Sequence, residues 1–354
     1  VDLTVNRNHQ TIHVAGHLDT SRQGTLTVQT DFLALGDYAD LAQQFLPLSN
    51  LHGAVEDATL TWTNNDKGSQ LSGQAELCQV GAAYMYDGQL LDLTADGQVS
   101  FDNLRFAARN LDVTVNSQKA RIQGRLDLTD SKNPQMEKLQ LQLEDFDPSA
   151  LPLDLPLEGK ISGEAMVSGT LDNLTGAGTF TIPELTVQGY TATQVELPFM
   201  VRKYRVETDG AKAHIGGGNV TVKASFDWQQ KDGEAELHTE DVDLGTFVPR
   251  LGSMILDGTL YATGTYKDSR LQVETVSSDL GLAWGNLSLQ DIALDAVLDG
   301  SSVTLKRISA ENSAGGGLVG SGSLQDGALS ADVYLTRLPI DPLLAAVGQE
   351  GKGT

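Results

Sequence analysis

Short runs in which every second residue is apolar recur along the chain. They include residues 12–18 (IHVAGHL), 122–128 (IQGRLDL) and 220–228 (VTVKASFDW). The residues between the apolar positions are mostly polar or charged. One apolar and one polar face is typical of a half-buried antiparallel strand, whereas strands of a parallel sheet are apolar on both faces. The pattern therefore predicts strands that bury a single face.

Turn residues separate these runs. Glycine accounts for 37 of the 354 residues and proline for only 10, and Asp-Gly, Gly-Gly or Asn stand between the alternating segments. Such punctuation is typical of strands joined by tight turns. Helical periodicity appears only briefly, at residues 37–45 and 342–347. We therefore predict an all-β fold with a few short helical turns.

The alternating strands repeat along the chain. Aligning Gly16, Gly124, Ala224 and Gly320 gives steps of 108, 100 and 96 residues (124−16, 224−124 and 320−224). An acidic turn followed by a short apolar segment recurs at a similar step, at Asp37, Asp147, Asp243 and Asp341. A period this long requires several strands in each repeat. We expect one continuous array: the end of a module at 1–30, modules at 31–145, 146–238 and 239–336, and the start of another at 337–354, with short helices at the junctions.

Alternating strands joined by tight turns favour an antiparallel meander in which each module continues the sheet of the previous one. The apolar face of such a sheet needs cover. Two solutions are open: a sandwich filled by its own side chains, or a U-shaped trough of the β-taco type. Aromatic residues make up only 6% of the chain, and small residues occupy apolar-face positions at 262–264 and 320–322. This composition favours an elongated curved sheet whose apolar inner face forms a groove.

A long apolar groove suits flexible hydrocarbon chains, since each methylene removed from water contributes about 0.8 kcal/mol. We expect the groove to be lined by apolar residues of the alternating strands. These residues are Ile122, Leu126, Leu128, Phe180, Ile182, Val220, Val222, Phe226, Trp228, Leu260, Ala262, Tyr266, Leu282 and Trp284.

Charge and cysteine content narrow the function classes. The chain has 24 Lys and Arg against 47 Asp and Glu, a formal charge of −23, so it would repel nucleic acid. A single cysteine, Cys78, excludes an intrachain disulfide and a multi-cysteine metal site. The sequence begins without Met and contains no signal-peptide pattern and no apolar stretch of membrane-spanning length. We expect a middle piece of a longer protein, soluble in itself.

Residue patterns that would indicate catalysis or metal binding are weak. His9, His13 and His17 lie four residues apart, which on a strand separates neighbouring imidazoles by about 13 Å, too far for one tetrahedral metal. The glycine triplets 216–218 and 315–317 are not followed by the Lys-Ser/Thr pair of a phosphate-binding loop. We predict no catalytic residue, no metal site, no cofactor and no enzymatic activity.

Two kinds of segment resemble a known family. Leu-x-Gly strand starts with small polar runs occur at 157–173 (LEGKISGEAMVSGTLDN) and 256–266 (LDGTLYATGTY). Gly-rich turns leading into a closing strand occur at 214–228 (HIGGGNVTVKASFDW) and 312–324 (NSAGGGLVGSGSL). In these features the chain resembles TamB-like translocation and assembly proteins, in the AsmA-like group of bacterial bridge-type lipid-transfer proteins.

The resemblance implies a function and a location. Such proteins are anchored in the inner membrane by an N-terminal helix, span the periplasm as a curved sheet with an apolar lumen, and contact a BamA-type or TamA-type outer-membrane protein. The implied function is to carry the acyl chains of phospholipids between the two membranes in support of outer-membrane biogenesis. The alternative is a structural or adhesive β-repeat spacer with a self-filled core and no ligand.

Overall fold

The structure is a computed structural model that describes residues 1–8, 10–44, 48–66, 68–86, 88–151, 157–187, 189–247, 249, 252–267, 270–299, 302–325 and 328–339. In these residues, 22 strands belong to one antiparallel sheet, and the single α-helix is α1 (Ala39–Ala42). The prediction of an all-β antiparallel fold is confirmed.

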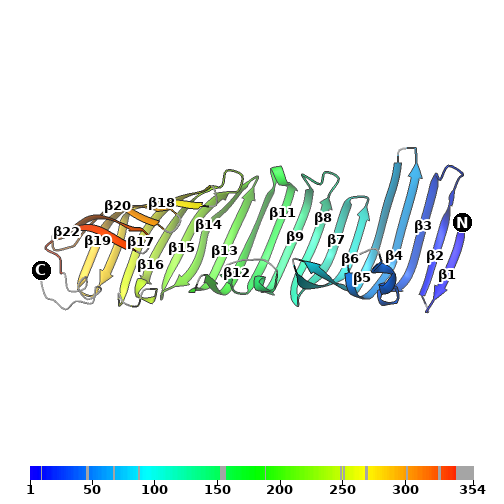
Figure 1. Cartoon of the computed structure of the whole chain (residues 1–354), viewed down its shortest axis with the longest axis horizontal. Helices are drawn as coiled ribbons and strands as arrows, with labels where there is room; N and C mark the ends of the chain where they lie inside the picture. Colours follow the sequence, from blue (N-terminus) through cyan, green and yellow to red (C-terminus); the bar gives the residue numbers. More distant parts are fainter. Residues whose placement is uncertain are drawn as a thin grey trace. The chain divides into compact units, whose positions relative to one another are not determined.

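The chain divides into two units, Val1–Phe180 and Thr181–Thr354. In the first unit the paired strands follow chain order as neighbours (Figure 1), with β11 next to β9. The strands of this unit are β1 (Asp2–Arg7), β2 (Gln10–Leu18), β3 (Gly24–Ala34), β4 (Leu48–Asn65), β5 (Gly68–Tyr86), β6 (Gln89–Asp102), β7 (Arg105–Val115), β8 (Gln118–Asp127), β9 (Gln135–Phe146), β10 (Leu157–Glu158), β11 (Ile161–Thr170) and the first part of β12 (Thr175–Val187).

The second unit is also a meander of neighbouring antiparallel strands from β13 onward. After the second part of β12, its strands are β13 (Tyr190–Arg202), β14 (Arg205–Ile215), β15 (Gly218–Asp227), β16 (Asp232–Asp243), β17 (Met254–Lys267), β18 (Arg270–Trp284), β19 (Leu287–Asp299), β20 (Ser302–Glu311), β21 (Gly317–Gln325) and β22 (Ala328–Thr336). The division into three modules stays a prediction.

Short helical turns follow strands at the acidic positions. The 3₁₀ turns are η1 (Leu35–Tyr38), η2 (Pro148–Ala150), η3 (Leu171–Asn173) and η4 (Leu244–Thr246). Asp37 lies within η1, while Asp147 and Asp243 cap η2 and η4 by accepting hydrogen bonds from the backbone N–H of Ser149 and Gly245. The equivalent Asp341 and the helical pattern at 342–347 lie outside the described residues. An acidic N-cap satisfies N–H groups that a short turn leaves without a partner.

Strand register places the alternating apolar residues on one face. Residues directly opposite each other in an antiparallel pair lie on the same face. Leu237 on β16 pairs with Val222 on β15 and with Leu260 on β17. In the next row, Ala235 pairs with Ala224 and with Ala262. Rows of branched and small apolar residues therefore run across the strands on one face of the second unit.

Many strands contain a β-bulge near their middle. The extra residues of eight bulged sites have left-handed backbone and are polar and exposed: Asp57, Gln79, Asn110, Lys138, Asp145, Gln194, Asp241 and Asp291. Register shifts accompany them in neighbouring strand pairs. Because a bulge bends its strand and increases its twist, these sites divide the affected strands into two segments.

Side chains of neighbouring strands satisfy the backbone groups that the bulges release. The backbone N–H of Gln79 donates to Asp96 Oδ2 at 3.1 Å, and that of Asp241 donates to Asp257 Oδ1 at 2.6 Å. Ser168 and Ser162 accept from Lys138 and Asp145 in the same way. An N–H outside the strand ladder needs such a partner, so these bulges have dedicated hydrogen-bond acceptors.

Candidate functional site: the apolar face of the sheet

In the first unit the apolar face is half-exposed along its length. Leu126 on β8 lies opposite Phe106 on β7 and Met136 on β9. The Phe106 ring is 6.4 Å from that of Phe101 on β6, yet Phe106 remains 41% exposed. The buried apolar side chains that the structure describes lie mostly in the second unit, and Ala83 and Pro148 are the buried ones described in this unit. Within its described residues, this unit has no second layer over the apolar face.

Exposure changes along the strands of the second unit. On β15, Val220 is 6% exposed and Phe226, on the same face, is 43% exposed. On β17, Met254 is 8% exposed and Tyr266 is 44% exposed. The strand ends near Val220 and Met254 are therefore closed, whereas the opposite ends of these strands leave the apolar face open to solvent.

A packed cluster covers the apolar face at the edge of the sheet near Met254. It consists of Met254, Leu280, Trp284, Leu287, Leu289, Ile292, Ala310 and Leu338, with Leu244, Leu256, Leu260, Leu282, Ile308 and Leu318 against it. Leu338, which follows β22, is 1% exposed, and Leu244 comes from η4. Here the chain fills its own apolar face.

The predicted lining residues occupy four regions of the two units. In the first unit, Ile122 and Leu126 lie on β8, Leu128 follows it, and Phe180 lies on β12 beside Gly163 of β11. In the second unit, the predicted residues are Ile182 on β12, Val220, Val222, Phe226 and Trp228 on or directly after β15, Leu260, Ala262 and Tyr266 on β17, and Leu282 and Trp284 on β18.

The structure brings some of these residues together and separates others. Val222 and Leu260 share one apolar row through Leu237. Trp284 belongs to the closed cluster, and Leu260 and Leu282 pack against it. Phe226 and Trp228, which is 39% exposed, lie at the open edge. The role of these residues as a lipid lining stays a prediction.

The accessible surface of the chain is larger than that of a compact monomer of the same length. The chain exposes 22,126 Å². A compact monomer of this length exposes about 14,000 Å² by the usual scaling of surface with size. Apolar surface contributes about 25 cal/mol for each Å² removed from water, so covering the open part of the face would be energetically favourable.

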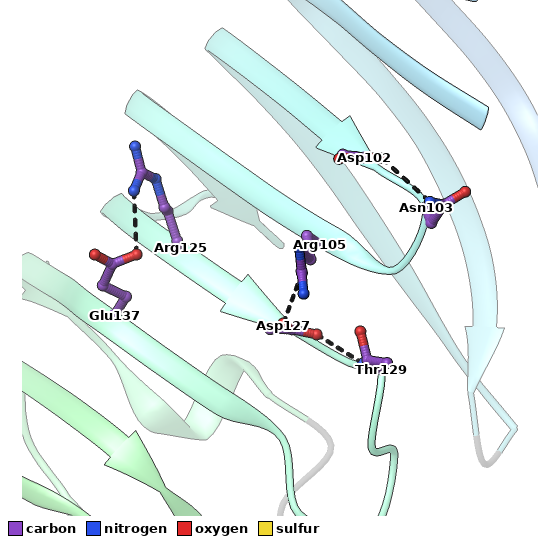
Figure 2. Close-up of polar contacts among 7 residues, drawn as sticks. All are labelled: Asp102, Asn103, Arg105, Arg125, Asp127, Thr129 and Glu137. Carbon is purple, nitrogen blue, oxygen red and sulfur yellow. Dashed lines mark hydrogen bonds and ion pairs between the residues drawn. The ribbon is translucent and has the colours of Figure 1, made fainter. Parts of the chain in front are cut away.

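The opposite face of the sheet carries cross-strand ion pairs. Figure 2 shows two of them in the first unit: Arg105 Nε lies 2.8 Å from Asp127 Oδ2, and Arg125 Nη1 lies 3.1 Å from Glu137 Oε2. The arginine side chains are 66% and 69% exposed, and an ion pair in such a setting contributes roughly 0 to 1 kcal/mol. These contacts favour the strand register and keep this face hydrated.

Hydrogen bonds lower the pKa of Asp127 to about 2. The largest cause is the hydrogen bond from the Thr129 hydroxyl, followed by the Thr129 backbone N–H and then by Arg105. The contact to Thr129 is drawn in Figure 2, and the backbone bond is 2.8 Å long. Donors that favour the ionised carboxylate lower its pKa. The carboxylate acts as a turn cap at the end of β8.

A shallow hollow of about 680 Å³ lies on this polar face. Its lining includes Gln74, Glu76, Gln98, Arg109, Arg125 and Glu137. The carboxylate of Glu137 accepts a hydrogen bond from Arg125, so charges in the hollow partly neutralise each other across strands. The hollow therefore resembles a hydrated, charge-balanced surface.

In the part of the chain that the structure describes, no three His, Cys, Asp or Glu side chains are arranged to hold a metal ion. No described helix is both long enough and apolar enough to cross a membrane. His9 of the histidine series lies outside the described residues, and His13 contacts Thr4 and Asp2.

Comparisons with family models, curated proteins and solved structures gave no match to this chain. The resemblance to TamB-like proteins therefore stays a prediction that rests on the sequence segments at 157–173, 214–228, 256–266 and 312–324.

Sequence reasoning missed the closure of one edge and the bulges. Leu338 lies beyond the last alternating strand, in a stretch without periodicity, so no pattern marked it as a core residue. The bulges had a partial signal, because a polar residue interrupts the alternation at Gln79, Asn110 and Asp241. A polar interruption in a strand is also compatible with an edge or a turn.

Proposed function

We propose that the apolar face of this sheet holds the acyl chains of phospholipids and thereby carries lipid along the protein. The observation that supports this function is an apolar face that is half-exposed in the first unit and, in the second unit, along one edge. Acyl chains fit such a face because they need apolar area and few polar contacts. In this proposal the protein acts without a cofactor or a chemical reaction.

The cellular setting is part of the proposal and draws on the resemblance alone. The chain would work in the periplasm of a bacterium with two membranes, as part of a longer protein anchored in the inner membrane. Its outer-membrane partner would be a BamA-type or TamA-type protein, and its contribution would be to outer-membrane biogenesis.

Native mass spectrometry of the purified chain tests lipid binding directly. We expect co-purifying phospholipid, and photocrosslinking of acyl chains from Val222 or Phe226 but not from Lys223 on the other face. Absence of bound lipid after expression in bacteria and after incubation with phospholipid, together with no crosslinks from the apolar face, would contradict the proposal.

An arginine on the apolar face separates an open surface from a filled core. Ala262→Arg and Val222→Arg place a charge among half-exposed apolar neighbours, so we expect lipid binding to fall while the strand signal in circular dichroism is retained. Thr263→Arg, on the exposed polar face of the same strand, is the matched control and should bind lipid normally. Loss of folding in both apolar-face variants would instead indicate a filled interior, since a buried unpaired charge is strongly unfavourable.

A spacer without a ligand is the second candidate, and the packed cluster of the second unit favours it. There the chain's own side chains cover the apolar face of β17 to β21. A spacer requires the same closure along the whole sheet. It predicts that neither lipid nor an apolar dye binds to the native protein.

A further inference from the structure

Basic side chains gather at one edge of the sheet. In the second unit this edge is formed by the hairpins between β13 and β14 and between β15 and β16, which we name the basic edge; it carries Arg202, Lys203 and Lys231. Backbone hydrogen bonds hold these hairpins together, since Trp228 N–H donates to Tyr204 O and Tyr266 N–H donates to Lys231 O. Three cations in two neighbouring hairpins are notable in a chain with a formal charge of −23.

The tight turns at the opposite edge of this unit contain no Lys or Arg. Residues 188–189, 216–217 and 285–286 read Gln-Gly, Gly-Gly and Gly-Asn. Gly189, Gly216 and Gly285 have positive φ there, as do Lys203 (φ 58°) and Lys231 (φ 61°) at the basic edge. A left-handed backbone favours Gly or Asn over a residue with a long side chain. Lysine at these two positions is therefore unfavourable in conformational energy. At the opposite edge, the basic residue with a positive φ is Arg337 (φ 51°), which follows the last strand.

The cations of the basic edge are exposed and have no acidic partner among the residues that the structure describes. Arg202, Lys203 and Lys231 are all exposed, and the ion pairs of this unit involve other basic residues, such as Arg205 with Glu234. Two acidic residues belong to the same hairpin as Lys231. Asp227 is engaged as a turn cap, since it accepts from the backbone N–H groups of Gln229 and Gln230, and, among the described residues, Asp232, opposite Asp227, forms no ion pair with Lys231. The positive charges are therefore available to an external anion.

Aromatic residues occupy the same two hairpins as these cations. Trp228 and Tyr204 contact each other edge to face, with ring centroids 6.1 Å apart, and Trp228 is 39% exposed. Phe226, 43% exposed, continues onto the apolar face. Trp and Tyr next to Lys and Arg are typical of positions where apolar chains meet polar headgroups. The basic edge is thus also the edge at which the apolar face is open.

The first unit repeats this arrangement. Its hairpins between β2 and β3 and between β8 and β9 carry the exposed Arg22 and Lys132. Apolar-face residues near the same edge are exposed, namely Leu18 (42%) and Phe106 (41%). Gln23 and Asp66 join two hairpins of this edge by a 2.6 Å hydrogen bond. Exposed cations beside an open apolar face are therefore present in each unit.

We propose that the basic edge binds the phosphate of a phospholipid whose acyl chains lie on the adjoining apolar face. This inference rests on the proposed function and adds the orientation of the lipid to it. Arg202 pairs with Arg205, which pairs with Asp227, so its side chain lies on the polar face. The phosphate therefore lies at the turn residues Lys203 and Lys231, the glycerol region lies near Tyr204 and Trp228, and the chains extend along β15 to β17 toward the closed cluster. From Tyr266 to Leu260 the open strand segment is about 20 Å long, at about 3.4 Å per residue.

A charge-reversed variant tests the inference. Lys203→Glu and Lys231→Glu are combined in the full chain, and binding of fluorescent phosphatidylglycerol and of the phosphate-free diacylglycerol with the same chains is measured. Loss of charge-assisted contacts to phosphate should weaken phosphatidylglycerol binding about tenfold or more and leave diacylglycerol binding unchanged. The matched control combines Lys212→Glu and Lys223→Glu on the polar face of the same unit, which changes the net charge equally.

Other results would contradict either the headgroup site or the proposed function. The headgroup site is overturned if the charge-reversed variant binds phosphatidylglycerol as tightly as the wild type does. It is also overturned if this variant loses affinity for both lipids equally, or if the control loses as much phosphatidylglycerol affinity as the variant. The proposed function stands in all three cases. If the wild-type chain binds neither lipid, the proposed function itself fails. Displacement of phosphatidylglycerol by inorganic phosphate at equal concentration would show a free-phosphate site and overturn the lipid assignment. Midpoints of urea unfolding for all three proteins verify that each is folded.

Discussion

At the residue scale, the alternation of side chains decides what each strand presents to its surroundings. On β15, Val222 contributes to the apolar rows, whereas its neighbour Lys223 lies on the polar face within 3.9 Å of Asp209. A one-residue slip of this strand would exchange the two faces. The same substitution therefore alters the apolar face at one position and the polar face at the next.

The capping carboxylates predict how stability depends on pH. The pKa values of Asp19, Asp127 and Asp147 are lowered chiefly by hydrogen bonds from nearby turn residues. The pKa of Asp243 is lowered chiefly by the backbone N–H of Met254 at the start of β17, and then by that of Gly245. A group with a lower pKa in the folded state stabilises the protein above its unfolded-state pKa, and this stabilisation is lost as pH falls through the folded-state pKa. For Asp127 the loss extends from about pH 4 to its folded pKa of about 2.

Urea unfolding at several pH values measures this effect. We expect the midpoint to be constant between pH 7 and pH 5 and to fall between pH 4 and pH 2. The Asp127→Asn variant should have a lower midpoint than the wild type at pH 7. Below pH 4, its midpoint should decrease less than that of the wild type. An identical pH profile for Asp127→Asn and wild type would contradict the assigned role of this carboxylate.

At the element scale, the bulges distinguish these strands from regular ones. The N–H of Asp241 on β16 bonds to Asp257 on β17, and Gly124 on β8 opposes the bulge at Lys138 on β9. A side chain at one strand thus fixes the bend of its neighbour. The bulges are set by cross-strand contacts rather than by the bulged residue alone.

Removing a bulge acceptor should destabilise the sheet modestly. Asp257→Ala leaves the Asp241 N–H without its 2.6 Å acceptor, and the expected loss of unfolding free energy is about 1 kcal/mol. Asp31→Ala is the control, since the described structure gives this exposed carboxylate no hydrogen bond or ion pair; its effect should stay within about 0.5 kcal/mol. Equal unfolding midpoints for the two variants would show that the acceptor is dispensable.

Glycine opposite a bulge is a stronger constraint. Gly124 has φ 129°, and a Cβ there would lie 2.4 Å from the carbonyl oxygen of Lys138. We expect Gly124→Ala to lower the unfolding free energy by roughly 1 to 3 kcal/mol, because the backbone must shift to relieve the contact. Gly217→Ala, at a turn with open space around the Cβ position, isolates the effect of positive φ and should cost less.

At the scale of the whole molecule, stability depends on neighbouring strands rather than on one central core. The packed cluster involves β17 to β21 and the segment after β22, whereas the first unit has few buried side chains among its described residues. Contacts between adjacent strands account for most of the long-range structure. An array of this type is stabilised mainly by nearest-neighbour interfaces.

An open apolar face should be visible in solution. We expect the native protein to bind an apolar dye such as ANS with enhanced fluorescence while its thermal unfolding remains cooperative. Phospholipid should displace the dye, and Ala262→Arg should reduce dye binding relative to Thr263→Arg. Absence of dye binding to the wild-type protein would indicate that its apolar face is covered.

The sequence by itself determined the fold class and the polarity of the strands. Alternation at period two is a local property, so 12–18, 122–128 and 220–228 predicted one-sided strands, and the structure has antiparallel strands there. The acidic positions Asp147 and Asp243 predicted short helical turns for the same reason, because a cap acts on the N–H groups of the residues directly after it.

Only the tertiary structure decided where the apolar face is closed and where it is open. Met254, Trp284 and Leu338 form one cluster although they are far apart in sequence, whereas Phe226 has the same alternation as Val220 and remains exposed. Exposure depends on which segments meet after the strands have paired, and on bends at bulges fixed by neighbouring strands. Those contacts are non-local, and a periodic pattern does not encode them.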